Sequence, residues 1–249
     1  MAIRVRGATC SLGEAVVDKL LSMDVDVIAI EESHKMRNET LLKYSQAKLL
    51  SDGEGYSISF DGSEADMAIG RDLIVHDLIP TRNDRWMPDE FKNWSTGLQC
   101  HGKSRYWLSV IDAANAIAHL ANTGNQYSGL QLCGRREWSS EDTQSEFEML
   151  WERTNQGQSG KFTAQTLFGH EIAGMEAKPI QDEASTRPDL QPVHNALLEI
   201  TGDGWRPLIT LRTAIMTLIA GLILSLIHIS EPTRRTPISY AVFCLKKKN

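Results

Sequence analysis

Residues Ile3 to Glu32, IRVRGATCSLGEAVVDKLLSMDVDVIAIEE, decide the fold of this chain. A short β-rich run leads into a turn that begins at Gly7 and ends at Gly13. Apolar residues then recur with helical spacing as far as Leu21, and a second apolar run follows from Val25 to Ile30. This order of strand, glycine turn, helix and strand predicts a βαβ unit with two parallel strands.

The turn and the acid that follows the second strand predict nucleotide binding. A helix that begins directly after a glycine turn presents free N–H groups and a partial positive charge to a pyrophosphate. Glu31 lies 18 residues after Gly13, where an acid at a strand tip can accept hydrogen bonds from a ribose diol. The same pattern also fits a Rossmann-like unit that no longer binds a nucleotide, and this alternative stays open.

The segment RVRGATCSLGEAVVDKLL resembles the extended short-chain dehydrogenase/reductase family, the NAD-dependent epimerases and dehydratases. That family's turn reads GxxGxxG. Gly7 and Gly13 match it, whereas Cys10 replaces the middle glycine, where the backbone comes closest to phosphate. The resemblance implies an α/β fold with a Rossmann-like parallel sheet, helices on both faces, fewer strands than usual and a small C-terminal α/β lobe.

The same resemblance implies NAD as the cofactor, with NADP left open because Glu31 only favours NAD. Family members carry an aspartate after the third strand that meets the adenine, and FDGSEADM places Asp61 there. The expected cofactor-binding residues are Gly7, Thr9, Cys10, Ser11, Leu12, Gly13, Glu31 and Asp61.

The family's catalytic pair, Tyr-x-x-x-Lys, is represented only by Tyr44 and Lys48. In the family the phenol moves a proton and the lysine, one helical turn on, lowers its pKa. Here the pair follows the second strand, three strands too early, so a surface pair on a flanking helix is the alternative reading. In the family, a fifth strand and the helix that carries this pair come next, and residues 81–94 leave no room for them. The chain is therefore expected to lack the catalytic middle of the family.

The resemblance resumes beyond residue 89 and reaches residue 220. Arg105 matches an arginine that meets a substrate diphosphate, with a salt bridge as the alternative, and Asp112 is expected to cap a helix. RPDL at 187–190 and GWRP at 204–207 resemble the C-terminal lobe. We expect a dinucleotide-binding domain over 1–155 and a shortened substrate lobe over 156–223. The implied partner is a nucleotide-sugar-like small molecule, and homodimers are common in the family.

The local patterns predict the remaining elements. Helices are expected over residues 39–50, 64–70, 112–121, 138–152, 192–200 and 208–222, and strands over 56–60, 72–78 and 127–133.

Residues 224–249, LSLIHISEPTRRTPISYAVFCLKKKN, resemble a sequencing-library adapter translated in frame. We therefore expect a non-native tail and a natural sequence that continues past residue 223. The apolar run 214–229 is too short for a membrane span, which needs about 20 residues. Without the tail's five basic residues and one acid, 21 basic and 31 acidic residues leave a net charge of −10, which argues against nucleic-acid binding.

Outside this tail the chain has three cysteines, Cys10, Cys100 and Cys133. Their spacing fits no metal-site pattern, and an odd number without a signal peptide favours a reducing cytoplasm.

Three functions follow from these observations. The first is an NAD-dependent epimerase or dehydratase of nucleotide sugars, in which the cofactor takes and returns a hydride. The second is a non-catalytic sensor or scaffold that binds a dinucleotide or nucleotide sugar, which the misplaced tyrosine favours. The third is a damaged reading frame without a function.

Overall fold

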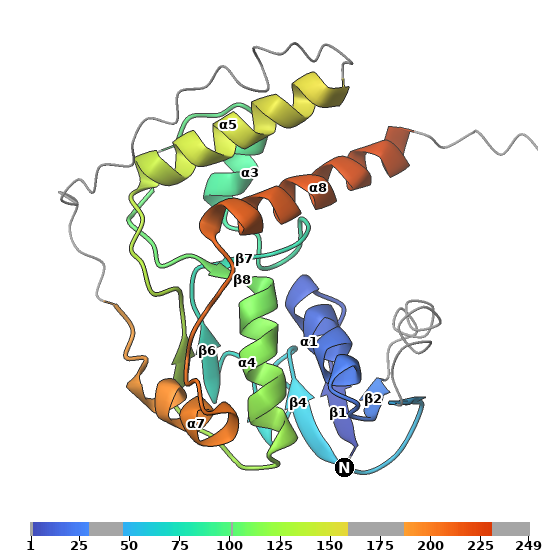
Figure 1. The fold of residues 1–249 in the computed structure, drawn as a ribbon. Helices are drawn as coiled ribbons and strands as arrows, with labels where there is room; N and C mark the ends of the chain where they lie inside the picture. The colour runs from blue at the N-terminus through green and yellow to red at the C-terminus, as the bar shows by residue number, and fades with distance from the viewer. Residues whose placement is uncertain (1, 30–46, 101, 159–186, 231–249) are drawn as a thin grey trace, which may run out of the picture.

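The computed structural model describes residues 2–29, 47–100, 102–158 and 187–230 of the 249-residue chain. Figure 1 shows the arrangement of its elements. In chain order they are β1 (Ile3–Arg6), α1 (Ser11–Ser22), β2 (Val27–Ala29), β3 (Leu49–Leu50), β4 (Tyr56–Ser59), β5 (Met67–Ala68), β6 (Leu73–Val75), β7 (Leu78–Ile79), α3 (Asp89–Ser95), β8 (Leu108–Ser109), α4 (Val110–Asn122), β9 (Leu130–Leu132), α5 (Ser140–Gln158), α7 (Gln191–Thr201) and α8 (Leu211–Ser230).

A five-stranded parallel sheet in the order β3-β2-β1-β4-β5 forms the framework. Ile3 of β1 is in register with Val27 of β2 on one side and with Tyr56 of β4 on the other. Two further parallel pairs, β6-β9 and β7-β8, continue the strand system. Two neighbouring parallel strands must be joined by a crossover connection, and α1 provides the one between β1 and β2. The predicted Rossmann-like α/β fold is confirmed.

Helices α1 and α4 lie side by side on one face of the sheet (Figure 1). The predicted apolar face of α1 is buried, with Leu20 fully shielded from solvent, and α4 buries a row of alanines beside it. Small side chains on α4 let the two helix backbones approach closely. Val193 and Leu197 of α7 join the same core, so residues after 187 share the hydrophobic interior of the N-terminal half.

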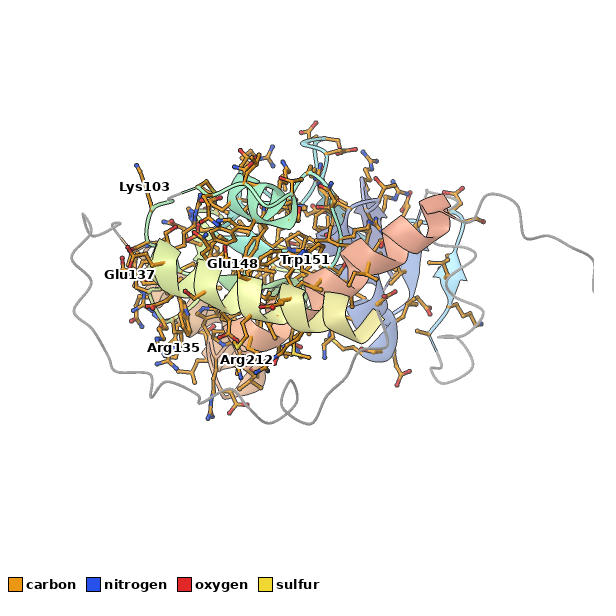
Figure 2. All side chains as sticks on the ribbon, turned by 90° about the horizontal axis from the view of Figure 1, so that it is seen from above. Lys103, Arg135, Glu137, Glu148, Trp151 and Arg212 are labelled. Atoms are coloured by element: carbon orange, nitrogen blue, oxygen red, sulfur yellow. The ribbon has the colours of Figure 1, made fainter. Side chains whose placement is uncertain are left out.

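A second core lies beyond the carboxyl ends of the strands, where α3, α5 and α8 meet. Phe91 and Phe147 are fully buried there, with ring centroids 5.6 Å apart. Figure 2 views the molecule from above this layer, and α5 and α8 lie next to each other nearest the viewer. The domain boundary expected between residues 155 and 156 falls within α5. In the described part of the expected substrate lobe, α7 packs in the first core and α8 in the second.

Several local predictions were wrong. Residues 64–70 form no helix, because Met67 and Ala68 pair with β4 as β5. The helix expected over 39–50 lies mostly outside the described residues, and its last two residues are strand β3. That extra strand makes Tyr56–Ser59 the fourth strand instead of the third.

The described part of the expected tail continues α8 to Ser230. Among the residues that the structure describes, none of the helices combines the length and apolarity needed to cross a bilayer.

Candidate functional site

The glycine turn after β1 is held against the end of β4. Gly7 has φ of +66°, a conformation that favours glycine, and a Cβ built there would lie 2.8 Å from Cβ of Asp61. At Gly13, a Cβ would lie 2.5 Å from Cα of Ala8. The two glycines therefore allow β1, its turn and α1 to pack as closely as a dinucleotide-binding unit requires.

Cys10, at the middle of the glycine turn, is the N-cap of α1. The residue is 5% exposed, and its Sγ accepts a hydrogen bond from the Gly13 backbone N–H at 3.4 Å. A helix leaves its first N–H groups without partners inside the helix, and here the Cys10 sulfur takes one of them. The side chain thus lies at the point where a diphosphate would meet the turn.

Asp84 takes the next N–H group of the same helix. Its Oδ2 accepts hydrogen bonds from the Ser11 backbone N–H at 2.6 Å and from the Ser11 hydroxyl at 2.5 Å. Its Oδ1 accepts from the Trp86 backbone N–H at 2.9 Å, which fixes the carboxylate within its own loop. A carboxylate is well placed at a helix N-terminus, because the helix dipole favours negative charge there.

Two arginines from the same loop hold it over the turn. Arg82 forms a bidentate pair with Glu14 of α1, at 2.8 and 2.9 Å, and donates to the Thr9 carbonyl at 2.7 Å. Arg85 donates to the Phe60 carbonyl at 2.5 Å and to Cys10 Sγ at 3.4 Å. We call residues 81–87 the plug, because they close the carboxyl end of β1 and the start of α1.

The Trp86 indole completes this cover, since its Nε1 donates to Cys10 Sγ at 3.4 Å. On the opposite side of the plug, α8 approaches so closely that a Cβ at Gly221 would lie 1.9 Å from the Thr81 carbonyl oxygen. The plug therefore lies between α1 and α8, with Arg85 still exposed on its outer side.

Asp61 lies beside the glycine turn and not at the end of an outer strand. It follows β4, which pairs directly with β1, so Asp61 lies against the turn at which a diphosphate is expected. Hydrogen bonds from Ser63 and Ser59 lower the pKa of Asp61 to about 2. Its carboxylate Oδ1 is 2.8 Å from the Ser59 hydroxyl and 2.9 Å from the Ser63 backbone N–H.

Lys48 lies far from this site. It is exposed and precedes β3, and its backbone N–H donates to Asp26 Oδ1 at 2.7 Å. The amino ends of parallel strands share one edge of a sheet, so Lys48 lies at the edge opposite the glycine turn. Lys48 itself is not in a helix, and its expected partner Tyr44 lies outside the described residues, as does Glu31.

Arg105 is engaged by two carboxylates. Its guanidinium donates to Asp77 Oδ1 at 3.0 Å and, through Nε, to Glu90 Oε1 at 3.0 Å. Asp77 also accepts from the Tyr106 backbone N–H at 2.9 Å. Arg105 thus forms the salt bridge that was the alternative prediction for this residue, and its guanidinium is paired with carboxylates of the chain itself.

A second polar pocket of about 280 Å³ lies by α7, and sequence reasoning missed it. Arg135, Arg187 and Arg206 line it together with His194, whose Nδ1 accepts from the Trp205 backbone N–H at 3.1 Å. The RPDL and GWRP segments supplied two of these arginines, but only the fold brings Arg135 beside them. Across residues 2–29, 47–100, 102–158 and 187–230, no group of His, Cys, Asp or Glu forms a metal site.

The backbone of the turn therefore has the shape that a diphosphate needs, but the N–H groups that would bind the diphosphate already have partners. Gly7, Gly13 and the α1 N-terminus have the expected arrangement, but Asp84 and the Cys10 sulfur already take the amide groups of Ser11 and Gly13. A diphosphate and the Asp84 carboxylate cannot share the Ser11 N–H, so the residues fit the cofactor only when the plug lies elsewhere.

The strand order and the glycine turn define the chain as an α/β protein with a Rossmann-like framework. No family model and no curated protein matches the sequence. Similar solved structures include dTDP-glucose 4,6-dehydratase from Bacillus anthracis str. Ames with NAD, at 11% identity and a TM-score of 0.48, covering 88% of this chain and 96% of that one.

Two others are the Bordetella bronchiseptica enzyme WbmF with NAD+ and UDP, and UDP-glucose 4-epimerase from Thermotoga maritima with UDP-glucose. WbmF is 10% identical with a TM-score of 0.47, and the match covers 92% of this chain and 94% of WbmF. The epimerase is 12% identical with a TM-score of 0.47, and the match covers 91% of this chain and 100% of the epimerase.

Proposed function

We propose that this chain binds an NAD-type dinucleotide at the turn between β1 and α1, and that it does so without the sugar chemistry of the epimerases and dehydratases. The observation that carries the proposal is the anion already held at the α1 N-terminus, the Asp84 carboxylate 2.6 Å from the Ser11 N–H. A position that holds a carboxylate by a backbone N–H group and a hydroxyl at a helix N-terminus also suits a phosphate oxygen.

The positions of the described tyrosines support binding without catalysis. Tyr56 donates to the Asn125 carbonyl at 2.8 Å, Tyr106 lies 3.2 Å from Glu137 Oε2, and Tyr127 lies 3.1 Å from the Thr123 hydroxyl. Each phenol is engaged away from the glycine turn. Within the described residues, the turn thus has no tyrosine–lysine pair to move a proton, a role worth roughly 10²–10⁴-fold in rate.

The arginine-lined pocket favours a second, phosphate-bearing ligand. Arg135, Arg187 and Arg206 converge on about 280 Å³, and guanidinium groups bind phosphate with bidentate geometry. A nucleotide sugar has the chemistry that such a pocket recognises. We therefore include a nucleotide-sugar-like molecule in the proposed function, and the free thiols of Cys10, Cys100 and Cys133 suit a protein of the reducing cytoplasm.

Titration of the purified chain with NADH, followed by the fluorescence of the nicotinamide, tests the first part of the proposal. We expect saturable binding that Gly13→Val weakens, because the larger side chain would press on Ala8 where a Cβ already comes within 2.5 Å of its Cα. Retained folding is checked by circular dichroism. Absence of saturation both in the parent chain and in Asp84→Asn, which removes the charge of the plug's carboxylate, would refute dinucleotide binding.

Titration with UDP tests the second part, with Arg187→Met as the variant and Arg71→Met as the control. Arg71 pairs with Asp72 beside a different pocket. We expect only Arg187→Met to weaken UDP binding. Turnover of UDP-glucose in the presence of NAD, by the parent chain, would contradict the assignment as a non-catalytic protein.

A further inference from the structure

We propose that the plug, residues 81–87, is an autoinhibitory segment whose Asp84 carboxylate competes with the diphosphate of a dinucleotide. The inference rests on the proposed function, because it names what regulates that same turn. Asp84 is 73 residues from Ser11 in the sequence, and its two hydrogen bonds to Ser11 join the loop after β7 to the first turn of α1.

The competition is for the same atoms. A helix N-terminus binds phosphate through its free N–H groups, and Asp84 accepts from the N–H of the first residue of α1. The negative charge of the carboxylate would also repel a diphosphate at that distance. Binding of one anion therefore requires release of the other.

The rest of the plug is built to hold Asp84 in place. Arg82 is anchored on Glu14, whose side chain is only 9% exposed, and on the Thr9 carbonyl. Arg85 and Trp86 reach the Cys10 sulfur from the other end of the segment. These contacts come from both ends of the loop, so the closed arrangement is held as a unit and not by one hydrogen bond.

Release of the plug has a readout that does not depend on any ligand. Cys10 is 5% exposed, and two of the groups around its sulfur, Arg85 and Trp86, belong to the plug. Withdrawal of the plug would expose the thiol. Reaction of Cys10 with iodoacetamide, located by peptide mapping, therefore measures opening directly.

The experiment compares the parent chain with Asp84→Asn and with the control Asp89→Asn. The first variant keeps the shape of the side chain and removes its charge. A hydrogen bond to a charged group is stronger than one between neutral groups by about 1.4 kcal/mol, a factor of about ten. The control removes the same charge from an exposed side chain that pairs with Lys92 on α3, outside the plug.

We expect Asp84→Asn to lower the Kd for NADH about tenfold and to raise the alkylation rate of Cys10 about tenfold, with Asp89→Asn within twofold of the parent on both measures. Equal NADH affinity and equal Cys10 reactivity in all three proteins would overturn the autoinhibition and leave the proposed function intact. Faster Cys10 alkylation in Asp84→Asn with no NADH binding by any protein would instead refute the proposed function, and with it the competition, while showing that Asp84 holds the plug.

Discussion

Replacing Gly7 by alanine tests the contact on which the geometry of the site depends. Gly7 has φ of +66°, and the new Cβ would lie 2.8 Å from Cβ and 2.9 Å from the backbone N of Asp61. An L-residue in the left-handed region costs about 1–2 kcal/mol. Forcing an extra methyl group into packed surroundings costs about 1–3 kcal/mol. We therefore expect Gly7→Ala to lower the free energy of unfolding by about 2–5 kcal/mol.

Gly62→Ala is the matched control, because it has the first cost without the second. Gly62 has φ of +82°, and nothing lies within 4 Å of a Cβ built there. We expect it to destabilise the chain by only about 1–2 kcal/mol. The difference between the two variants isolates the contact between the glycine turn and Asp61.

Guanidinium unfolding followed by tryptophan fluorescence measures both variants, with unchanged m-values showing that the transition midpoint reports stability. For a chain of this size each kcal/mol shifts Tm by about 2–4 °C, so thermal unfolding checks the result independently. Equal destabilisation by the two substitutions, within about 0.5 kcal/mol, would show that the turn does not press against Asp61 and would refute the close approach of β1 and β4 at this end of the sheet.

Three further predictions concern other parts of the chain. Phe147→Ala should lower the free energy of unfolding, measured in urea, by about 3–5 kcal/mol, because the fully buried ring lies 5.6 Å from Phe91 and 5.9 Å from Trp94 between centroids. A loss below about 1 kcal/mol would mean that the second core is not packed as described. Asp112→Ala should cost about 1.5–3 kcal/mol, since the carboxylate accepts the Leu208 and Ile209 N–H groups at 3.0 Å each, and Asp112→Asn should recover part of the loss. Burial, and then the charge of Asp66, raise the pKa of Tyr56 from 10.0 to about 12. The stability that the protonated phenol contributes should therefore be complete below pH 10 and decline as the pH rises through 12. Spectroscopic titration of tyrosinate should show this ionisation in the parent chain and not in Tyr56→Phe.

Local patterns predicted the elements whose formation depends on nearby residues. The turn between Gly7 and Gly13, the apolar face of α1 and the strand over 56–60 follow from spacing alone, and the structure confirms them. Strand β5, with only two residues, is too short to show a period of two, so residues 64–70 were predicted as a helix. Strand β3 was hidden in the same way at the end of an apparent helical pattern.

Side-chain roles that depend on distant partners were not predictable in this way. Asp112 was expected to cap its helix, but Ser109 is the N-cap of α4 and its hydroxyl accepts from the Ile111 N–H at 3.2 Å. Asp112 is instead committed to the backbone of Leu208, 96 residues away. Likewise, nothing within the sequence of the plug indicates that Asp84 reaches the start of α1.

The conflict at the glycine turn has a physical origin in the N–H groups at the start of α1. A helix that begins at the carboxyl end of β1, beneath a layer formed by α3, α5 and α8, has N–H groups that water reaches poorly, and a buried unpaired N–H group costs about 1–3 kcal/mol. A bound diphosphate would satisfy these groups, but so do the Cys10 sulfur and the Asp84 carboxylate. The Cys10 sulfur and the Asp84 carboxylate therefore occupy N–H groups that a diphosphate would use, in a turn whose two glycines still pack closely enough for one.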